Sequence, residues 1–369
     1  MFADLLGVRL VLWIGGTVPL PAPVELLQSF SRIEVTNDST TDDGFQMTFA
    51  LSRGPLGYAV PPALAVMNRV IIGIIHGIIP EPLIDGVITH VQFSPGNGST
   101  PATVSVTGRD LTAVMDLEEK NATFPNQPDM AIVARVLAGY ARYGMVPAPA
   151  PTVDVPIMLE RIPRQQETDL QFVKRMAERN GYVFYLEPLT FGTSKAYWGP
   201  QLRAGIPQRA LTVDMGSATN VRNLNFANDA LAATGTRGSF IEPFLKLSLP
   251  IPALPSLKIP PLAAFPATPY RTTLQRTTGP QNPVTAGITA LAATTNVPDP
   301  FTADGELDGT RYGGVLRARG LVGVRGAGLE NDGFWYVKRV THTLTRSEYS
   351  QSFSLSREGS GTLTPVVIP

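Results

Sequence analysis

Three histidines, His76, His90 and His342, are the side chains best suited to metal binding or proton transfer in this 369-residue chain. They stand far apart in the sequence and form neither an HExxH motif nor an i,i+4 pair, the spacing that places two imidazoles on one helix face. A zinc site needs three or four ligands together. The spacing therefore favours structural histidines on strands over metal ligands, and we expect neither a metal nor another cofactor.

Carboxylate pairs are the next candidates, because glycoside hydrolysis requires two positioned carboxyl groups. Glu118 and Glu119 are adjacent and precede Lys120, a pattern typical of a solvated helix or loop. Glu81 and Asp85 flank turn residues and receive the same structural interpretation. We therefore expect no catalytic residues among them.

The glycine pattern and the lack of cysteine exclude further chemistry. The chain has no cysteine, so disulfides, thiolate metal sites and cysteine nucleophiles are absent. Closely spaced glycines near residue 320 have neither the strand-to-helix context nor the acidic partner of a dinucleotide fingerprint. Bulges and tight turns explain them better. These glycines are Gly320, Gly323, Gly326 and Gly328.

The composition indicates a packed protein rich in turns and short strands. Hydrophobic residues make up 43% and charged residues 16% of the chain, and it contains 34 glycines and 34 prolines. Thirty basic and 30 acidic residues give a formal net charge of zero. No Lys/Arg cluster is long enough to follow a phosphate backbone, so we expect no specific nucleic-acid partner.

The apolar N-terminal segment, residues 1–21, is a poor signal peptide. It lacks a basic n-region, and Asp4 and Arg9 interrupt the apolar run. A second apolar run at 70–79 contains His76 and is followed by Pro80, which leaves it too short for a membrane span. We expect a chain made in the cytoplasm without a signal peptide or a membrane span.

The segment 164–185 has the clearest local signals for one helix followed directly by one strand. Thr168 is a good N-cap, Gln171 completes a capping box, and Asp169 places negative charge at the positive helix end. Asn180 and Gly181 supply a left-handed C-terminal stop. The apolar face of this helix consists of Leu170, Phe172, Val173, Met176 and Ala177.

A second segment, residues 332–342 and 349–357, has the pattern of an antiparallel hairpin with an Asp-Gly start and alternating strands. The two segments together resemble the central baseplate hub proteins of contractile injection systems. That family includes phage late-control protein D and the hub part of type VI secretion spike proteins. The residues that carry the resemblance are Gln165, Glu167, Thr168, Asp169, Phe172, Arg175, Asn180 and Gly181 in the first segment, and Asp332, Gly333, Val340, His342, Tyr349, Phe353, Leu355 and Arg357 in the second.

The resemblance covers roughly residues 8–358 and implies a fold and an assembly role rather than a reaction. It implies a mainly β protein with an α+β insert, in which two β-barrel tube-type domains form a pseudo-sixfold ring as a homotrimer. Such a hub joins the sixfold inner tube to a threefold spike and templates tube assembly. Its partners would be an inner tube or tube-initiator protein, a separate spike protein and baseplate wedge proteins in a phage tail or contractile injection particle.

The segmentation of the chain agrees with that plan. We expect a first barrel at 1–116, the α+β insert at 117–202, and a second barrel at 203–369 that includes a proline-rich arm at about 234–300. Strands are expected at 8–14, 33–37, 45–49, 87–93, 103–109, 157–159, 210–213 and 221–226, with the last strands between 314 and 357. The insert should open with a helix that Asp129 caps, and a proline-rich turn is expected at 147–156. The prolines of the arm should prevent regular ladders.

A weak internal repeat supports two barrels on one plan. The segment that begins at Asp85-Gly86 parallels the one that begins at Asp332-Gly333, and each is followed by a strand that ends in arginine, Arg109 or Arg357. Three chains with two similar barrels each would present six nearly equivalent faces. Two other functions stay open: a tail-associated cell-wall hydrolase and a receptor-binding module on the particle.

Overall fold

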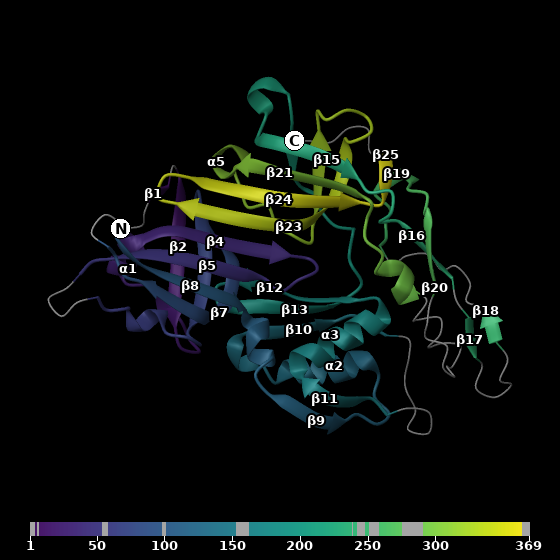
Figure 1. The fold of residues 1–369 in the computed structure, drawn as a ribbon, viewed down its shortest axis with the longest axis horizontal. Helices are drawn as coiled ribbons and strands as arrows, with labels where there is room; N and C mark the ends of the chain where they lie inside the picture. Colours follow the sequence, from purple (N-terminus) through teal and green to yellow (C-terminus); the bar gives the residue numbers. More distant parts are fainter. Residues whose placement is uncertain are drawn as a thin grey trace.

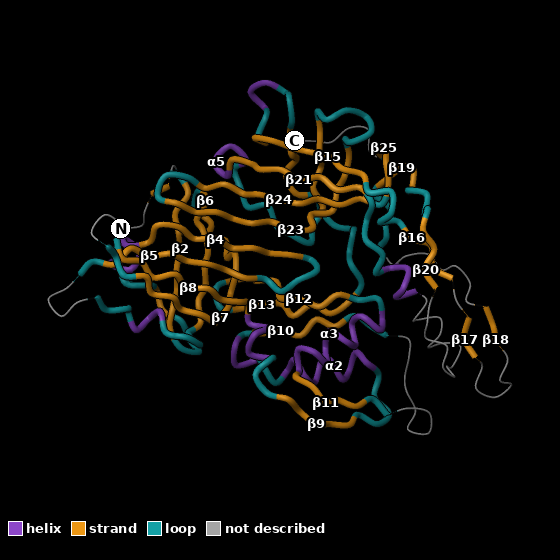
Figure 2. Tube along the Cα trace, viewed as in Figure 1, coloured by secondary structure: helices purple, strands orange, loops and turns teal. Residues whose placement is uncertain are grey.

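The computed structural model describes residues 4–5, 7–53, 58–97, 101–152, 162–237, 239–241, 248–250, 258–274 and 291–363. The protein is mainly β, as the sequence predicted. A 14-stranded sheet, nearly all of it antiparallel, forms the upper body, and an α+β part lies below it (Figures 1 and 2). None of the helices in the described ranges has the length and apolar composition needed to cross a membrane.

The N-terminal part contributes eight strands to this sheet, six of them in the order β2-β6-β7-β8-β5-β4. The other two are the short strands β1 (Asp4–Leu5) and β3 (Leu20–Pro21), which both pair with β2. Alternating apolar residues place one face of each strand in a core, as in β5, where Phe45, Met47 and Phe49 are buried. The six strands are β2 (Val8–Gly15), β4 (Phe30–Asp38), β5 (Gly44–Leu51), β6 (Arg69–His76), β7 (Ile79–Ser94) and β8 (Ala102–Asp110). All except β6 contain a strand expected from sequence. We call these six strands the first repeat.

The C-terminal part contributes a second set of six in the order β14-β22-β23-β24-β21-β15. Its core includes Trp335, Val337, Val340, Phe353 and Leu355. The strands are β14 (Gln208–Thr212), β15 (Val221–Asn228), β21 (Phe301–Asp308), β22 (Leu321–Arg325), β23 (Gly333–Thr345) and β24 (Tyr349–Arg357). We call these six strands the second repeat.

The two repeats share one strand order: numbered along the chain within each repeat, the six strands occur in the same spatial order. They differ in the direction of the first strand, because β2 pairs with β6 antiparallel and β14 pairs with β22 in parallel. Their irregularities coincide too. β7 carries a bulge at Thr89, opposite β8, and β23 carries a bulge at Lys338, opposite β24. Met67 and Arg319 both have positive φ, 66° and 67°. The Met67 N–H donates to the Ile88 carbonyl, and the Arg319 N–H donates to the Val337 carbonyl. The duplication expected from sequence is therefore present.

The register of the repeat differs from the sequence expectation. Alignment of the two bulges makes Ile88 equivalent to Val337, so Asp85 corresponds to Phe334 and not to Asp332. The Asp-Gly match was thus two positions out of register. Likewise, Arg109 pairs across from Val87 while Ser356 pairs across from Tyr336, so the equivalent of Arg109 is Ser356 and not Arg357.

The expected closed barrels are not found among the described strands. A barrel closes when its first and last strands pair. Here β4, the last strand of the first repeat, pairs with β23 of the second repeat, and the ladder continues to β15. The two repeats are therefore two parts of one open sheet.

The α+β part lies between the repeats in sequence and below the sheet in Figure 1. Its strands are β9 (Glu119–Thr123), β10 (Met145–Pro149), β11 (Arg164–Thr168), β12 (Val183–Thr190) and β13 (Thr193–Gly199), and its helices are α2 (Asp129–Ala138) and α3 (Asp169–Asn180). Trp198 is buried at its centre, and its indole N–H donates to the Val173 carbonyl at 3.1 Å.

Two details of this part correct the sequence analysis. Asp129 does not cap α2: Pro128 holds the cap position, and Asp129 is the first helical residue. Its carboxylate accepts a hydrogen bond from Asn180 at 2.8 Å and so joins the start of α2 to the end of α3. Residues 147–149, expected in a turn, belong to β10, which pairs in parallel with β13. The strand expected at 157–159 lies outside the described residues.

The proline-rich segment contains short ladders, contrary to expectation. β16 (Thr234–Arg237) pairs with β20 (Arg271–Leu274), β17 (Ser239–Ile241) with β18 (Ser248–Pro250), and β19 (Ala263–Pro266) with β25 (Gly359–Thr362). Each ladder has at most four paired positions, which fits edge strands that tolerate proline. β21 (Phe301–Asp308) begins directly after this segment and was missed entirely.

Candidate functional site

The two repeats meet where β4 pairs with the second half of β23, a contact that we call the seam. β22 pairs with β23 only up to Tyr336, and β4 occupies the vacated side from Arg339 onward. Seven residue pairs follow, from Arg339 opposite Asp38 to Thr345 opposite Arg32. The N–H of Ser39 extends the ladder by donating to the Lys338 carbonyl at 2.9 Å. The seam is thus an ordinary antiparallel ladder, and the residues whose side chains pair across it are 301 and 305 positions apart in sequence.

Charge and hydroxyl pairs fix the register of the seam. Arg339 Nε donates to Asp38 Oδ2 at 2.5 Å, and the hydroxyls of Thr36 and Thr341 lie 3.0 Å apart. Burial raises the pKa of Asp38, but hydrogen bonds from Thr40 and Arg339 outweigh it, so the pKa lies below its ordinary value. Asp38 therefore stays ionised, and a slip by one residue would separate it from Arg339.

Arg319 joins three parts of the molecule at one end of the seam. Its guanidinium donates to Asp43 at 2.5 and 3.0 Å and lies over the Tyr185 ring of β12, 4.3 Å from the centroid. The side chains of Arg319 and Asp43 are 8% and 2% exposed. Burial lowers the pKa of Arg319, but Asp43 raises it by more, so this arginine stays charged. The first repeat, the α+β part and the second repeat therefore meet at Arg319.

Asp110 and Asp42 extend this charged region toward α3. Asp42 pairs with Arg109 at 2.5 Å and with Lys174 of α3. Asp110 accepts a hydrogen bond from the Thr112 N–H at 3.0 Å. Burial, together with the neighbouring charge of Asp43, raises the pKa of Asp110 to about 7. The cluster therefore contains one carboxyl that titrates near neutral pH.

Sequence reasoning did not find this cluster. It singled out none of Asp38, Asp43 and Asp110, and Arg319 stood in the glycine-rich stretch that was interpreted as bulges and turns. One signal was available: charged residues are scarce in this chain, yet three aspartates fall between positions 38 and 43.

The predicted helix α3 has the expected ends. The N–H of Gln171 donates to Thr168 Oγ1 at 3.3 Å, and Gly181 takes the left-handed conformation with φ of 67°. A side chain at Gly181 would meet Ala292 at 2.9 Å, so close packing also requires glycine. Asn180 donates to Asp129 and to the Met176 carbonyl, both at 2.8 Å.

The remaining predicted residues of this segment build a buried polar network at the helix start. The Asp169 carboxylate accepts from Gln165 at 2.6 Å, from Tyr140 at 2.7 Å and from Lys120 at 2.5 Å. Burial, and then Asp169, raise the pKa of Tyr140 well above its ordinary value. On the exposed side, Arg175 pairs with Glu167 at 2.7 Å and lies over the ring of the buried Phe172. All eight predicted residues thus lie on one helix–strand unit, in structural positions.

The predicted residues of the second segment lie along β23 and β24. Val340, Phe353 and Leu355 are in the core of the second repeat. Asp332 accepts from the Ala327 N–H at 2.8 Å, and Gly333 has φ of 107°, which favours glycine. The buried Arg357 guanidinium donates to the carbonyls of residues 330, 332 and 359 and lies 4.3 Å from the Trp335 ring centroid. Desolvation lowers the pKa of Arg357.

The three histidines lie on separate strands. His76 ends β6, His90 lies in the exposed half of β7, and His342 is buried in β23 with Nδ1 3.0 Å from the Tyr349 hydroxyl. Burial lowers the pKa of His342 to about 3, so the imidazole is neutral. Within the described residues, no group of three acidic, histidine or cysteine side chains is arranged to hold a metal ion.

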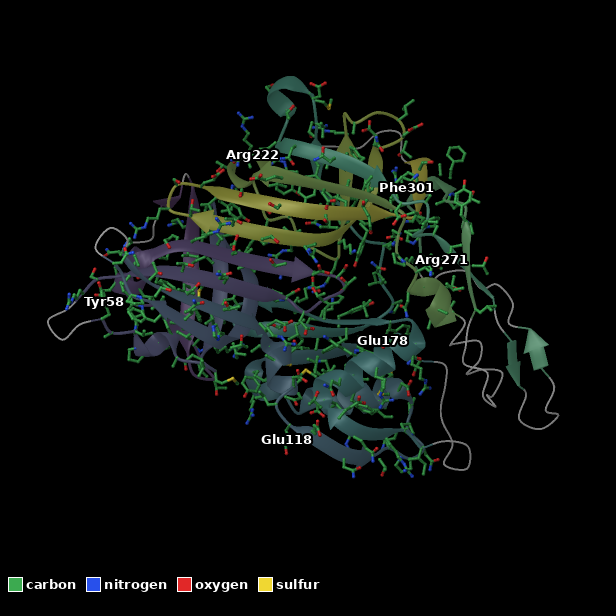
Figure 3. All side chains as sticks on the ribbon, viewed as in Figure 1. Tyr58, Glu118, Glu178, Arg222, Arg271 and Phe301 are labelled. Atoms are coloured by element: carbon green, nitrogen blue, oxygen red, sulfur yellow. The ribbon has the colours of Figure 1, made fainter. Side chains whose placement is uncertain are left out.

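The candidate carboxylates are not paired for chemistry. Glu118 is exposed at the lower edge of the molecule in Figure 3, just before β9. Glu81 and Asp85 were expected to flank a turn, but both lie within β7. Asp85 is buried and binds Arg69 Nη2 at 2.6 Å. Glu81 binds Arg317 of the second repeat at 3.0 Å.

The arrangement of strands matches solved tail-protein structures. No protein-family model matches the sequence, and no curated protein sequence matches it. The chain is similar to a tail protein from Neisseria meningitidis, with 16% identity over 95% of this chain and 97% of that chain and a TM-score of 0.66. A 43 kDa tail protein of a Shewanella oneidensis prophage gives 16% identity, 95% and 96% coverage and a TM-score of 0.62. The chain shares their fold.

A third structure extends the likeness beyond phages. It is an Escherichia coli component of the type VI secretion system that itself shows structural similarity to tail proteins of bacteriophage T4. Identity is 14%, coverage is 92% of this chain and 78% of that chain, and the TM-score is 0.56. At such identities the likeness concerns the fold.

Proposed function

We propose that this protein is the structural baseplate hub of a contractile tail or injection system. Three copies form a ring that joins the sixfold inner tube to a threefold spike and templates assembly of the tube. The observation that carries the proposal is the duplication: β2-β6-β7-β8-β5-β4 and β14-β22-β23-β24-β21-β15 repeat one strand order within one chain. The fold shared with tail proteins and a type VI secretion component supports the same role.

The duplication supplies the symmetry that such an adaptor needs. A ring of three chains has strict threefold symmetry, yet it contains six copies of the repeat. One face of this ring can therefore bind six tube subunits through nearly equivalent surfaces. Features that occur once in each chain, such as α3, remain threefold and suit the spike.

The partners follow from this position in the particle. We propose that the chain binds itself as a homotrimer, an inner tube or tube-initiator protein on one side, a separate spike protein on the other, and wedge proteins around it. It is made in the cytoplasm and incorporated into a phage tail baseplate or a contractile injection particle. We propose no catalytic role and no cofactor.

The proline-rich segment suits a contact with a neighbouring subunit or with the surrounding baseplate. Its C-terminal end, just before β21, is held in place by Arg203, which is fully buried and binds Asp299 at 2.5 Å and Glu358 at 2.7 Å. Lys258 adds an ion pair with Asp299 at 3.2 Å. The backbone N–H groups of Leu262 and Ala263 donate to Glu358.

Native mass spectrometry tests the proposed hub. We expect a species three times the mass of the 39.6 kDa chain, and we expect this species to seed polymerisation of the cognate tube protein. A single-chain species that releases fragments from peptidoglycan would indicate a cell-wall hydrolase instead. A chain exposed to antibody on intact particles would indicate a receptor-binding module.

A further inference from the structure

The duplication identifies two strand edges that have no partner within the described part of the chain. β4, the edge strand of the first repeat, pairs with β23 at the seam. Its equivalent in the second repeat is β15, which pairs with β21 alone among the described strands and ends the sheet. The equivalent of the seam half of β23 is the second half of β7, which β6 and the two residues before it leave without a strand partner after Ile88. In Figure 1, β15 lies near the top of the sheet and β7 near its lower side.

The equivalence of β4 and β15 extends to single residues. Each strand carries one bulge opposite its neighbour, at Ser31 in β4 and at Arg222 in β15. Aligned on these bulges, Thr36 corresponds to Ala227 and Asp38 to Asp229. The carboxylates of Asp38 and Asp229 each accept a hydrogen bond from the N–H two residues further on. Figure 3 places Arg222 at the upper margin of the sheet, beside this open edge.

The equivalence therefore predicts which residues of the two free edges would lie opposite each other if the edges paired. At the seam, Arg339 lies opposite Asp38 and Thr341 lies opposite Thr36. Their equivalents place His90 opposite Asp229, Gln92 opposite Ala227 and Phe93 opposite Phe226.

The side chains at the two edges agree with such a pairing. Phe93 is 40% exposed, and Val91 and Phe226 are half-buried apolar residues on the same edges. The equivalents of Phe93 and Phe226 in the seam are His342 and Val35, which are both buried. An exposed edge with apolar side chains is a template for another strand. The geometry leaves these edges at opposite ends of one molecule, so they cannot meet within it.

We propose that β15 of one chain pairs in antiparallel fashion with residues 90–94 of β7 in a second copy of this chain, in the register of the internal seam. The contact is head-to-tail, so its repetition closes a ring when the rotation per chain is a whole fraction of a turn. The inference rests on the proposed trimeric hub for the number of copies. It adds the strands, the register and the facing residues that make the interface.

Cysteine cross-linking tests the register directly, because the chain has no cysteine of its own. The double variant Ala227→Cys, Gln92→Cys places thiols at the positions equivalent to Thr36 and Thr341, whose hydroxyls are 3.0 Å apart. We expect oxidation to yield covalent dimers and trimers on a non-reducing gel. The variant Thr36→Cys, Thr341→Cys is the matched control, and its disulfide should form within one chain.

A shifted pair, Ala227→Cys with Ser94→Cys, tests the register against mere proximity. Diagonal neighbours lie roughly 7–8 Å apart in such a ladder, beyond the usual disulfide Cα spacing of about 4.4–6.8 Å. We expect several times less cross-linking than from the matched pair. Equal cross-linking would overturn the register. Trimers that form without the matched cross-link would overturn this inference and leave the proposed hub standing, whereas a chain that stays single at every concentration contradicts both.

Discussion

The sharpest stability prediction concerns Arg319, the arginine at which the three parts of the molecule converge. Replacement by Met keeps most of the side-chain volume and removes the charge that neutralises Asp43. Loss of one partner of a buried ion pair costs about 3–5 kcal/mol, because the other charge stays buried without compensation. Asp43 retains hydrogen bonds from the side chain of Asn37 and the N–H of Asp38, both at 2.9 Å. We therefore expect Arg319→Met to lower the free energy of unfolding by about 3 kcal/mol, the lower end of that range.

Urea unfolding followed by tryptophan fluorescence measures this cost, since Trp198 and Trp335 report on the α+β part and the second repeat. Arg222→Met is the matched control. Arg222 binds Glu306, Asp308 and Glu348, but its side chain is 39% exposed, and exposed ion pairs contribute only about 0–1 kcal/mol. An Arg319→Met cost no larger than that of the control would refute the reasoning.

Further predictions concern titration and close packing. Because the folded pKa of Asp110 is raised to about 7, the wild type loses stability as pH rises from about 4 to about 7. Asp110→Asn should therefore gain stability relative to wild type between pH 4 and pH 8, by up to about 4 kcal/mol in urea titrations. Since the folded pKa of His342 is lowered to about 3, its contribution is lost as pH falls below about 6.5. His342→Phe, which copies the equivalent Phe93, should lessen the loss between pH 7 and pH 5 by about 2 kcal/mol. A methyl group at Gly108 would lie 2.1 Å from the Phe45 ring and 2.4 Å from the Val87 carbonyl. Gly108→Ala should lower the melting temperature by several degrees, while Gly16→Ala, with open space around it, should leave it unchanged.

Much of the fold was predictable where local signals agree. Helix α3 was predicted because its cap, its apolar face and its glycine stop all indicate the same boundaries, and the structure places them at Thr168 and Gly181. Strands β5 and β8 of the first repeat alternate cleanly and were found for the same reason, whereas β6, a continuous apolar run buried on both faces, was not among the expected strands. β21 was missed because it follows Pro298 and Pro300, and a proline-rich approach conceals the start of a strand.

Sequence reasoning could not supply the relations between positions that are far apart along the chain. The duplication was inferred from an Asp-Gly match, but the true register depends on the bulges at Thr89 and Lys338, which depend on pairing with other strands. The same holds for the charged cluster. Arg319 and Asp43 are 276 residues apart, and only the β4·β23 ladder brings them together. No local pattern encodes such a contact.

Electron cryo-microscopy of the assembled protein tests the central claim most directly, namely that duplicated strand sets in three chains make a sixfold face. We predict a ring of three chains with six similar strand sets, in which β15 of each chain continues into β7 of the next. A single chain, or a ring whose β15 and β7 edges both face solvent, would contradict the account.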